Sequence, residues 1–204
     1  MPAHDPPHQL LERLHDGNAR FASDAPIAPN RGSDHRKAIA YAQSPFAVIV
    51  ACSDSRMPVE MVFDQGFGDL FVVRLAGHVL SPAAVGSVEF AVDSLGARLV
   101  MILGHTRCSA VKVTMEVIDK YLTVDEQRKL GHVAAIIDAI RPAVVRAFKH
   151  EGDAYENAIR ENVRGQVEEL IVRSPSLRQR ARDGEIEVVG SMYDLDSGLV
   201  RDVG

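Results

Sequence analysis

The sequence predicts an α/β fold with a mostly parallel central β-sheet flanked by helices. Apolar, β-branched segments without a polar face recur along the chain, as expected of strands that are buried on both sides of a parallel sheet. Helical patterns separate these segments, which indicates strand–helix–strand units. The 204 residues contain no internal repeat or low-complexity segment, so we expect one domain. It would comprise an N-terminal helical arm (1–45) and an α/β core (46–204).

The N-terminal arm begins with an amphipathic pattern over residues 9–21. Leu10 and Leu14 recur at helical spacing among charged residues, which predicts a helix with one apolar face. Residues 25–33 are rich in Pro, Asn and Gly and should form an extended connection. A short helix is expected at 35–42.

The core should contain four buried strands, at residues 46–51, 70–73, 99–103 and 186–190. Between the second and third strands, Ser81-Pro82 opens a helical pattern that ends at Gly96. Residues 125–182 are almost entirely helical in pattern, with Pro142 and Ser174-Pro175 as expected breakers.

Composition excludes several classes of function. The formal charge of −5, from 23 basic and 28 acidic residues, argues against nucleic acid as the main partner. No stretch has the length of a membrane-spanning helix, and the first residues lack the pattern of a secretory signal. We therefore expect a cytoplasmic protein. In that setting, the two cysteines are less suited to a structural disulfide than to a metal site, a reactive thiol or burial.

Both cysteines directly follow predicted strands. Cys52 comes after strand 46–51, and His105 and Cys108 come after strand 99–103. Ligands of open α/β sheets bind at the carboxyl ends of strands, so neighbouring strands would bring these three side chains together. Two thiolates and one imidazole suit zinc, and three protein ligands leave a fourth position for water. Buried, inert thiols beside a hydrogen-bonded histidine remain the alternative.

Asp54 and Arg56 strengthen the zinc interpretation. An arginine two residues beyond a carboxylate can bind it with two parallel hydrogen bonds, keep it ionised and orient it beside a metal. An ordinary loop salt bridge is the alternative for this pair. Two anionic sulfurs would make water at the metal less acidic than three histidines would, so activity should rise through mildly alkaline pH.

The motifs together resemble one known family. Cys52-x-Asp54-x-Arg56, followed about fifty residues later by His105-x-x-Cys108, is similar to the signature of the β-class carbonic anhydrases. The resemblance covers most of the chain and continues through residues 17–21, 63–66, 68–74, 86–92, 189–190 and 193–195.

For the metal site, the resemblance implies that Cys52, His105 and Cys108 bind one Zn²⁺ per subunit. Asp54 and Arg56 would be catalytic and would position a zinc-bound hydroxide that adds to carbon dioxide and yields bicarbonate. In a closed state Asp54 would itself bind the metal.

For the substrate, the resemblance implies a small pocket that binds carbon dioxide and bicarbonate. Its residues would be Gln43, Phe71, Ala76, Phe90 and Gly104, with Gln43 hydrogen-bonded to bicarbonate. The resemblance also implies a homodimer or a tetramer, with the N-terminal helix packing on a partner subunit. Neither nucleic acid nor a membrane is expected as a partner.

Several positions depart from the family pattern. Ser109-Ala110 stands where glycines usually follow the second cysteine, and Leu75 and Phe90 replace a common asparagine and tyrosine. His78 is a candidate proton relay to solvent, although a loop histidine without a role is the more common case. Hydrolysis of carbon disulfide or carbonyl sulfide, and non-catalytic binding of bicarbonate or zinc, remain alternatives. A thiol-redox role lacks a Cys-x-x-Cys motif.

Overall fold

The computed structural model describes residues 5–120 and 129–203. The strands are β1 (Ala47–Cys52), β2 (Leu70–Leu75), β3 (Leu99–His105), β4 (Glu187–Tyr193) and β5 (Val200–Asp202). The helices are α1 (Pro7–Ala22), α2 (Ser33–Ala38), α3 (Val59–Val62), α4 (Pro82–Asp93), α5 (Ser109–Asp119), α7 (Val133–Ala147), α8 (Ala154–Arg173) and α9 (Pro175–Arg182), with a short 3-10 turn η1 (Ala76–His78).

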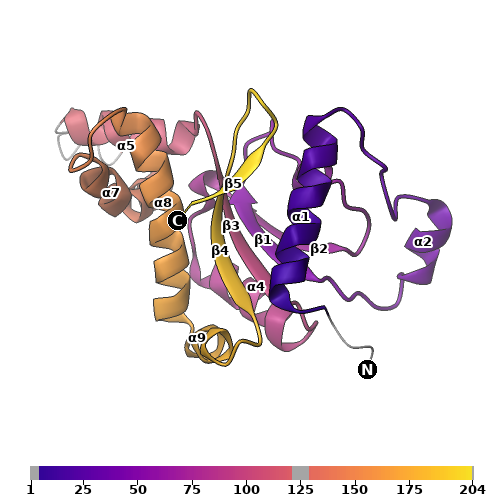
Figure 1. The fold of residues 1–204 in the computed structure, drawn as a ribbon. Coiled ribbons are helices and arrows are strands. Elements are labelled where there is room, and N and C mark those ends of the chain that lie inside the picture. The colour runs from indigo at the N-terminus through magenta and orange to yellow at the C-terminus, as the bar shows by residue number, and fades with distance from the viewer. Residues whose placement is uncertain (1–4, 121–128, 204) are drawn as a thin grey trace.

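One five-stranded sheet forms the centre of the molecule, in the order β2-β1-β3-β4-β5 (Figure 1). The first four strands are parallel, and β5 is antiparallel to β4. Every residue of β1 and β3 is buried, because helices cover both faces of the sheet. The predicted α/β class and its mostly parallel sheet are confirmed.

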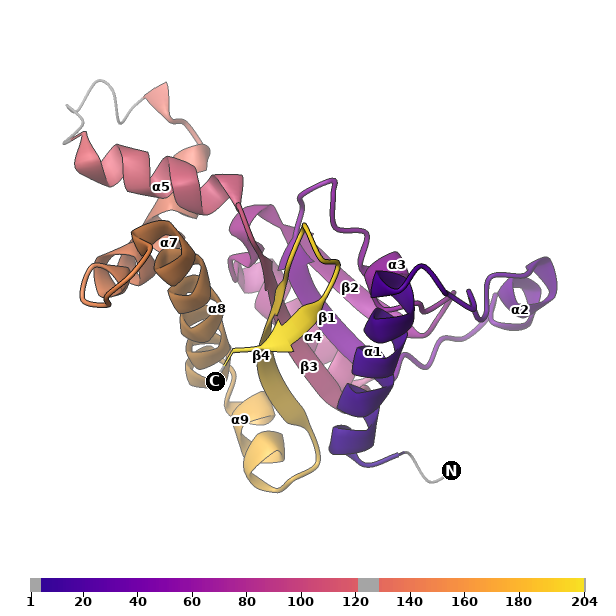
Figure 2. The same ribbon diagram turned by 45° about the horizontal axis from the view of Figure 1, so that its top comes forward.

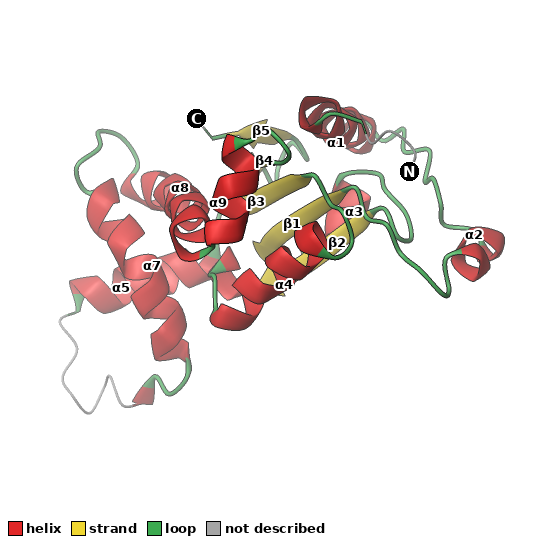
Figure 3. Ribbon diagram, turned by 90° about the horizontal axis from the view of Figure 1, so that it is seen from below, coloured by secondary structure: helices red, strands yellow, loops and turns green. Residues whose placement is uncertain are grey.

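The helices lie in two groups around the sheet. Helix α8 packs against β3 and β4, and α5 and α7 pack on α8, so these three form a helical lobe at one side (Figures 1 and 2). Helix α4 packs on β1 and β2, whereas α1 lies on the opposite side of the sheet (Figure 3). Among the described helices, none combines the length and apolar character needed to cross a bilayer.

The N-terminal helix α1 is tied to its own chain. Leu10 and Leu14 are buried in the core of the same subunit. The Asn18 side chain donates to the carbonyls of Val62 (3.1 Å) and Gly198 (2.8 Å) and accepts from the backbone N–H of Val200 (2.7 Å). The apolar face of α1 is therefore covered within one chain, and packing of this helix on a partner remains a prediction.

Two details differ from the sequence-based expectations. Pro142 lies inside α7, so its prediction as a breaker is wrong, while Ser174-Pro175 does separate α8 from α9. An internal proline costs about 3 kcal/mol. The burial of Ile140 and Val144 on either side of Pro142 offsets that cost. Strand β5 was not predicted, and residues 125–128 of the expected helical region lie outside the described residues.

Candidate functional site

Cys52, His105 and Cys108 come together at one edge of the sheet. Cys52 ends β1, His105 ends β3, and Cys108 immediately precedes α5. Because β1 and β3 are parallel neighbours, their last residues reach the same edge. The two sulfurs and the imidazole nitrogen all lie within 4.8 Å of one another, and all three residues are buried. This confirms the predicted convergence.

The chemistry of this cluster fits a metal ion. His105 Nδ1 donates to the carbonyl of Thr106 at 2.9 Å, which leaves Nε2 with its lone pair. That Nε2 is buried and has no hydrogen-bond partner among the described residues. A buried nitrogen without a partner is costly unless something else binds it. Two sulfurs beside such a nitrogen form a donor set that suits zinc.

The two sulfurs are hydrogen-bonded to each other, which favours negative charge on the pair. The hydrogen bond from Cys108 is the main cause that lowers the pKa of Cys52, and the Gly77 N–H contributes. The Gly77 nitrogen lies 3.3 Å from Cys52 Sγ. In return, the neighbouring thiolate raises the pKa of Cys108, and burial adds to that effect. The pair therefore favours a thiolate, which suits the binding of a cation.

Asp54 and Arg56 form the predicted bidentate pair beside the cluster. Arg56 Nε lies 2.9 Å from Asp54 Oδ1, and its Nη2 lies 2.7 Å from Oδ2. The backbone N–H of Arg56 also donates to Oδ1, at 2.9 Å. Arg56 holds the pKa of Asp54 well below its usual range. Asp54 Oδ2 lies 3.8 Å from His105 Nε2, so the carboxylate reaches the cluster while the arginine restrains it.

Two residues that the sequence analysis did not assign to this site also support it. Arg74 donates from Nε to the Cys52 carbonyl (3.0 Å) and from Nη2 to the Asp54 carbonyl (2.6 Å). The Tyr155 hydroxyl on α8 donates to the carbonyl of Cys108 at 2.8 Å. Arg74 lies opposite Ala51 in the β1–β2 register, so a correct strand alignment would have found it. Tyr155 carries no such signal.

The predicted pocket residues are divided between two regions of the chain. Ala76 lies next to Gly77, which contacts the cluster, whereas Gln43 is exposed and precedes β1, at the end of that strand remote from Cys52. Phe71 pairs with Phe90 at a ring-centroid distance of 6.4 Å and lies opposite Val48, early in the strands. One chain therefore does not bring Gln43, Phe71 or Phe90 to the cluster.

Gly104 and His78 both lie near the cluster and pack against α8. A Cβ at Gly104 would lie 2.5 Å from Val163 Cγ2, so this glycine permits close packing of the helix. His78 is fully buried, and burial lowers its pKa to about 4, so it is neutral and does not face solvent. The expectation of a direct relay from His78 to solvent is therefore wrong. A loop histidine is buried here because Asn162 supplies a hydrogen-bond partner.

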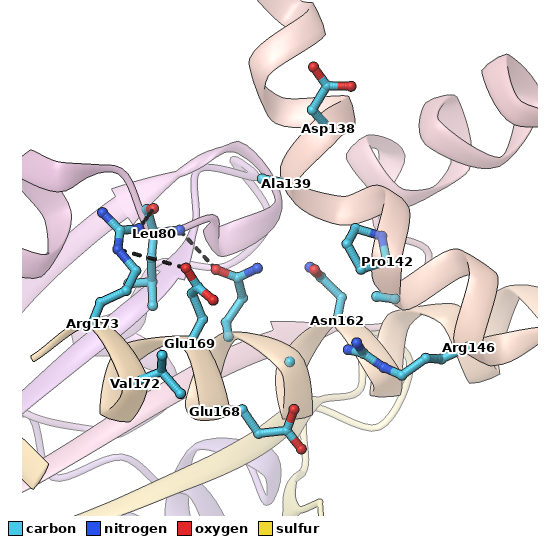
Figure 4. A pocket seen from close by; sticks show the side chains of 13 residues that line it. Leu80, Asp138, Ala139, Pro142, Arg146, Asn162, Glu168, Glu169, Val172 and Arg173 are labelled. Atoms are coloured by element: carbon cyan, nitrogen blue, oxygen red, sulfur yellow. Dashed lines mark hydrogen bonds and ion pairs between the residues drawn. The ribbon is translucent and has the colours of Figure 1, made fainter.

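A cavity of about 440 Å³ opens between α7 and α8 (Figure 4). Its lining includes Arg146, Asn162, Gln166 and Arg173 from both helices. None of the three residues of the thiol–imidazole cluster lines it, and Asn162 lies between this cavity and the turn that contacts Cys52.

Known proteins share both the sequence and the fold. A sequence model of the family described as carbonic anhydrase matches residues 47–200. The chain is 37% identical to the carbonic anhydrase of Mycolicibacterium smegmatis over 194 residues, 95% of this chain and 92% of that protein. It is also 37% identical to carbonic anhydrase 2 of Mycobacterium tuberculosis over 192 residues, 94% of this chain and 90% of that protein.

Solved structures show the same architecture. The β-carbonic anhydrase CcaA superposes with a TM-score of 0.72 at 23% identity, covering 96% of this chain and 93% of that structure. A Coccomyxa β-carbonic anhydrase bound to acetazolamide superposes with a TM-score of 0.72 at 24% identity, covering 95% and 86%. At 23% and 24% identity, these two structures are evidence only for the fold.

Proposed function

Because this chain belongs to the β-class carbonic anhydrase family, we propose that it hydrates carbon dioxide reversibly at the Cys52–His105–Cys108 cluster. One observation supports this location above the others. His105 Nε2 is buried without a hydrogen-bond partner in the described part of the chain, and it faces two thiols at the point where the Arg56-bound carboxylate of Asp54 also lies. A purely structural role would not explain why an imidazole nitrogen, two thiols and a restrained carboxylate meet at one point.

The two sulfurs and the free imidazole nitrogen would hold one Zn²⁺ per subunit. Bound zinc acidifies water and thereby supplies the nucleophile for carbon dioxide. Asp54, kept ionised by Arg56, accepts a hydrogen bond and so orients the attacking group. The two hydrogen bonds from Arg56, together with the backbone contact of Arg74, hold the carboxylate away from the metal position. Neutral carbon dioxide needs no charged partner, so an apolar pocket suffices to admit it.

We further propose that the substrate pocket is completed by a second subunit. Within one chain, Ala76 lies next to the residue that contacts the cluster, and Gly104 would form the floor of the substrate pocket. Gln43 precedes β1, Phe71 lies early in β2 and Phe90 packs on it from α4, so all three are remote from the cluster of their own chain and a partner's copies would serve it. The β-carbonic anhydrases of Sordaria macrospora, which share this fold, are tetrameric. Hydrolysis of carbon disulfide or carbonyl sulfide would use the same site, but the named relatives favour carbon dioxide.

The test is stopped-flow carbon dioxide hydration at mildly alkaline pH on protein with a measured zinc content. Cys52→Ser should lose bound zinc, and Asp54→Ala should keep zinc but lose hydration by a factor of about 10² or more. Asp196→Ala is the matched control, since it removes an exposed carboxylate that is also paired with an arginine. Zinc-loaded protein that hydrates carbon dioxide no faster than buffer would contradict the proposal.

A further inference from the structure

A single residue, Gly77, connects the proposed metal centre to helix α8. The N–H of Gly77 points at Cys52 Sγ (3.3 Å), and the carbonyl of the same residue accepts from Asn162 Nδ2 (2.9 Å). Asn162 is fully buried on α8, at the edge of the cavity in Figure 4. The side chain of a distant helix therefore holds the residue that hydrogen-bonds a candidate metal ligand.

The contacts fix the orientation of this amide. The Gly77 carbonyl can only accept, so the nitrogen of Asn162 must face it. The same Nδ2 lies 3.0 Å from His78 Nε2, which must then accept as well, and the ring proton belongs on Nδ1. Burial lowers the pKa of His78 to about 4, so the ring is neutral and can accept this bond. Asn162 thus donates to two consecutive residues of η1.

This arrangement costs stability. Asn162 Oδ1 and His78 Nδ1 are buried with no partner among the described residues. In the η1 turn, His78 (φ +46°) has a left-handed backbone conformation, which is strained for a residue with a Cβ, whereas Gly77 (φ +65°) adopts it freely. An apolar side chain at position 162 would avoid the unpaired amide oxygen but would leave the Gly77 carbonyl and His78 Nε2 without their donor. Strain and unpaired polar groups that persist beside a reactive centre are typical of positions kept for function.

We propose that Asn162 is a positioning residue for the metal centre, because it holds the Gly77 N–H on the sulfur of Cys52. The inference rests on the proposed function, since it concerns the metal that Cys52 would bind. A hydrogen bond to a ligating thiolate withdraws negative charge from the sulfur and orients it. Without the bond, the sulfur is no longer held in place, which weakens metal binding, and it donates more charge, which makes the bound metal a weaker acid.

The test compares two buried amides of the same helix. Asn162→Leu removes the contact with Gly77. Gln166→Leu is the matched control, because Gln166 lies one turn later, is also buried and accepts from the N–H of Leu80 (2.9 Å). Asn162→Ala is a second variant, whose smaller side chain leaves space that adjoins the cavity.

Three measurements on metal-loaded protein report on the centre. Zn²⁺ affinity is measured by competition with a chelator, and the Co²⁺-substituted protein is followed by its thiolate-to-metal charge-transfer absorption. The pH dependence of carbon dioxide hydration is the third measurement. For the Asn162 variants we expect about tenfold weaker zinc binding, a shifted charge-transfer band and a pH profile moved toward higher pH. Gln166→Leu should lose similar thermal stability but match the parent in all three.

Equal losses of zinc affinity in the Asn162 and Gln166 variants would overturn the proposal, because they would show only a general effect of α8 packing. So would an Asn162 variant with the parent's affinity and charge-transfer band. Failure of the proposed function looks different. The zinc-loaded parent would then hydrate no carbon dioxide, while affinity and the cobalt spectrum would still test the contact between Asn162 and Gly77.

Discussion

Replacing Gly104 by alanine tests whether this glycine serves helix packing or the substrate pocket. The added Cβ would lie 2.5 Å from Val163 Cγ2 and 2.9 Å from Met192 Sδ. Carbon atoms in ordinary contact lie about 3.5–4.0 Å apart, so Val163 would have to retreat by about 1 Å. Valine in a helix has one strongly preferred rotamer, so α8 itself must move.

Overpacking of this kind costs about 1–3 kcal/mol. For a chain of this size, each kcal/mol lowers the melting temperature by about 2–4 °C. Gly104→Ala should therefore melt several degrees below the parent and unfold at lower urea concentration. If the glycine acts through packing, KM for carbon dioxide should change little.

The double variant Gly104→Ala/Val163→Ala separates the two roles. Val163→Ala alone removes buried methyl groups and destabilises the fold, but it also vacates the space that the new Cβ needs. The two substitutions should then cost less together than the sum of their separate costs, as measured by urea unfolding at one protein concentration. Additive costs, combined with a raised KM that Val163→Ala does not relieve, would refute the packing argument.

Three other predictions follow from the described contacts. Arg56→Ala should raise the pKa of Asp54, free its carboxylate to approach the metal and lower the hydration rate by a factor of about 10². Arg56→Lys should not restore the rate. Full restoration by lysine would contradict the need for two parallel hydrogen bonds. Asp64→Asn should cost about 1–3 kcal/mol at neutral pH, because it breaks the ion pair between the buried Asp64 carboxylate and the partly exposed Arg20. Burial favours a higher pKa for Asp64, but hydrogen bonds from Arg20 and two backbone N–H groups outweigh it and lower the pKa. The stabilisation is thus full above the unfolded value of about 3.9 and is lost as pH falls through the lower native value. Urea unfolding should show the Asp64→Asn penalty shrinking below about pH 4, and a penalty independent of pH would contradict this assignment. Asn18→Leu should make the N-terminal helix accessible to limited proteolysis while the sheet stays folded, and unchanged protection would show that the apolar contacts alone hold it.

The fold could be predicted well where burial leaves a clear pattern. The strands at 46–51 and 99–103 were placed to within two residues, because strands buried on both faces show no polar positions. Strand β5 was missed since it has only three residues, two of them exposed. Pro142 was wrongly predicted to break the helix. The burial of its neighbours, which depends on the tertiary structure, outweighed the tendency of proline to end a helix.

The metal cluster was predictable because its residues follow strands that proved to be neighbours. The supporting contact of Asn162 was not, since that residue lies 85 positions from Gly77 and resembles any polar residue of a helix. The roles of Gln43 and Phe71 also could not be built from one chain. Both lie at the end of the sheet remote from Cys52, and a single sequence gives no signal for residues that a second subunit would bring to a site.

The hydrogen bonds of Asn18 also constrain the order in which the chain can fold. They join residues 180 and 182 positions apart, so they close nearly the entire chain into one loop. Helix α1 can pack early on α3, which is close to it in sequence, whereas its bonds to Gly198 and Val200 need the distant β4–β5 region. These long-range bonds carry the larger loop-closure cost, so we expect them to form late and to complete the docking of α1.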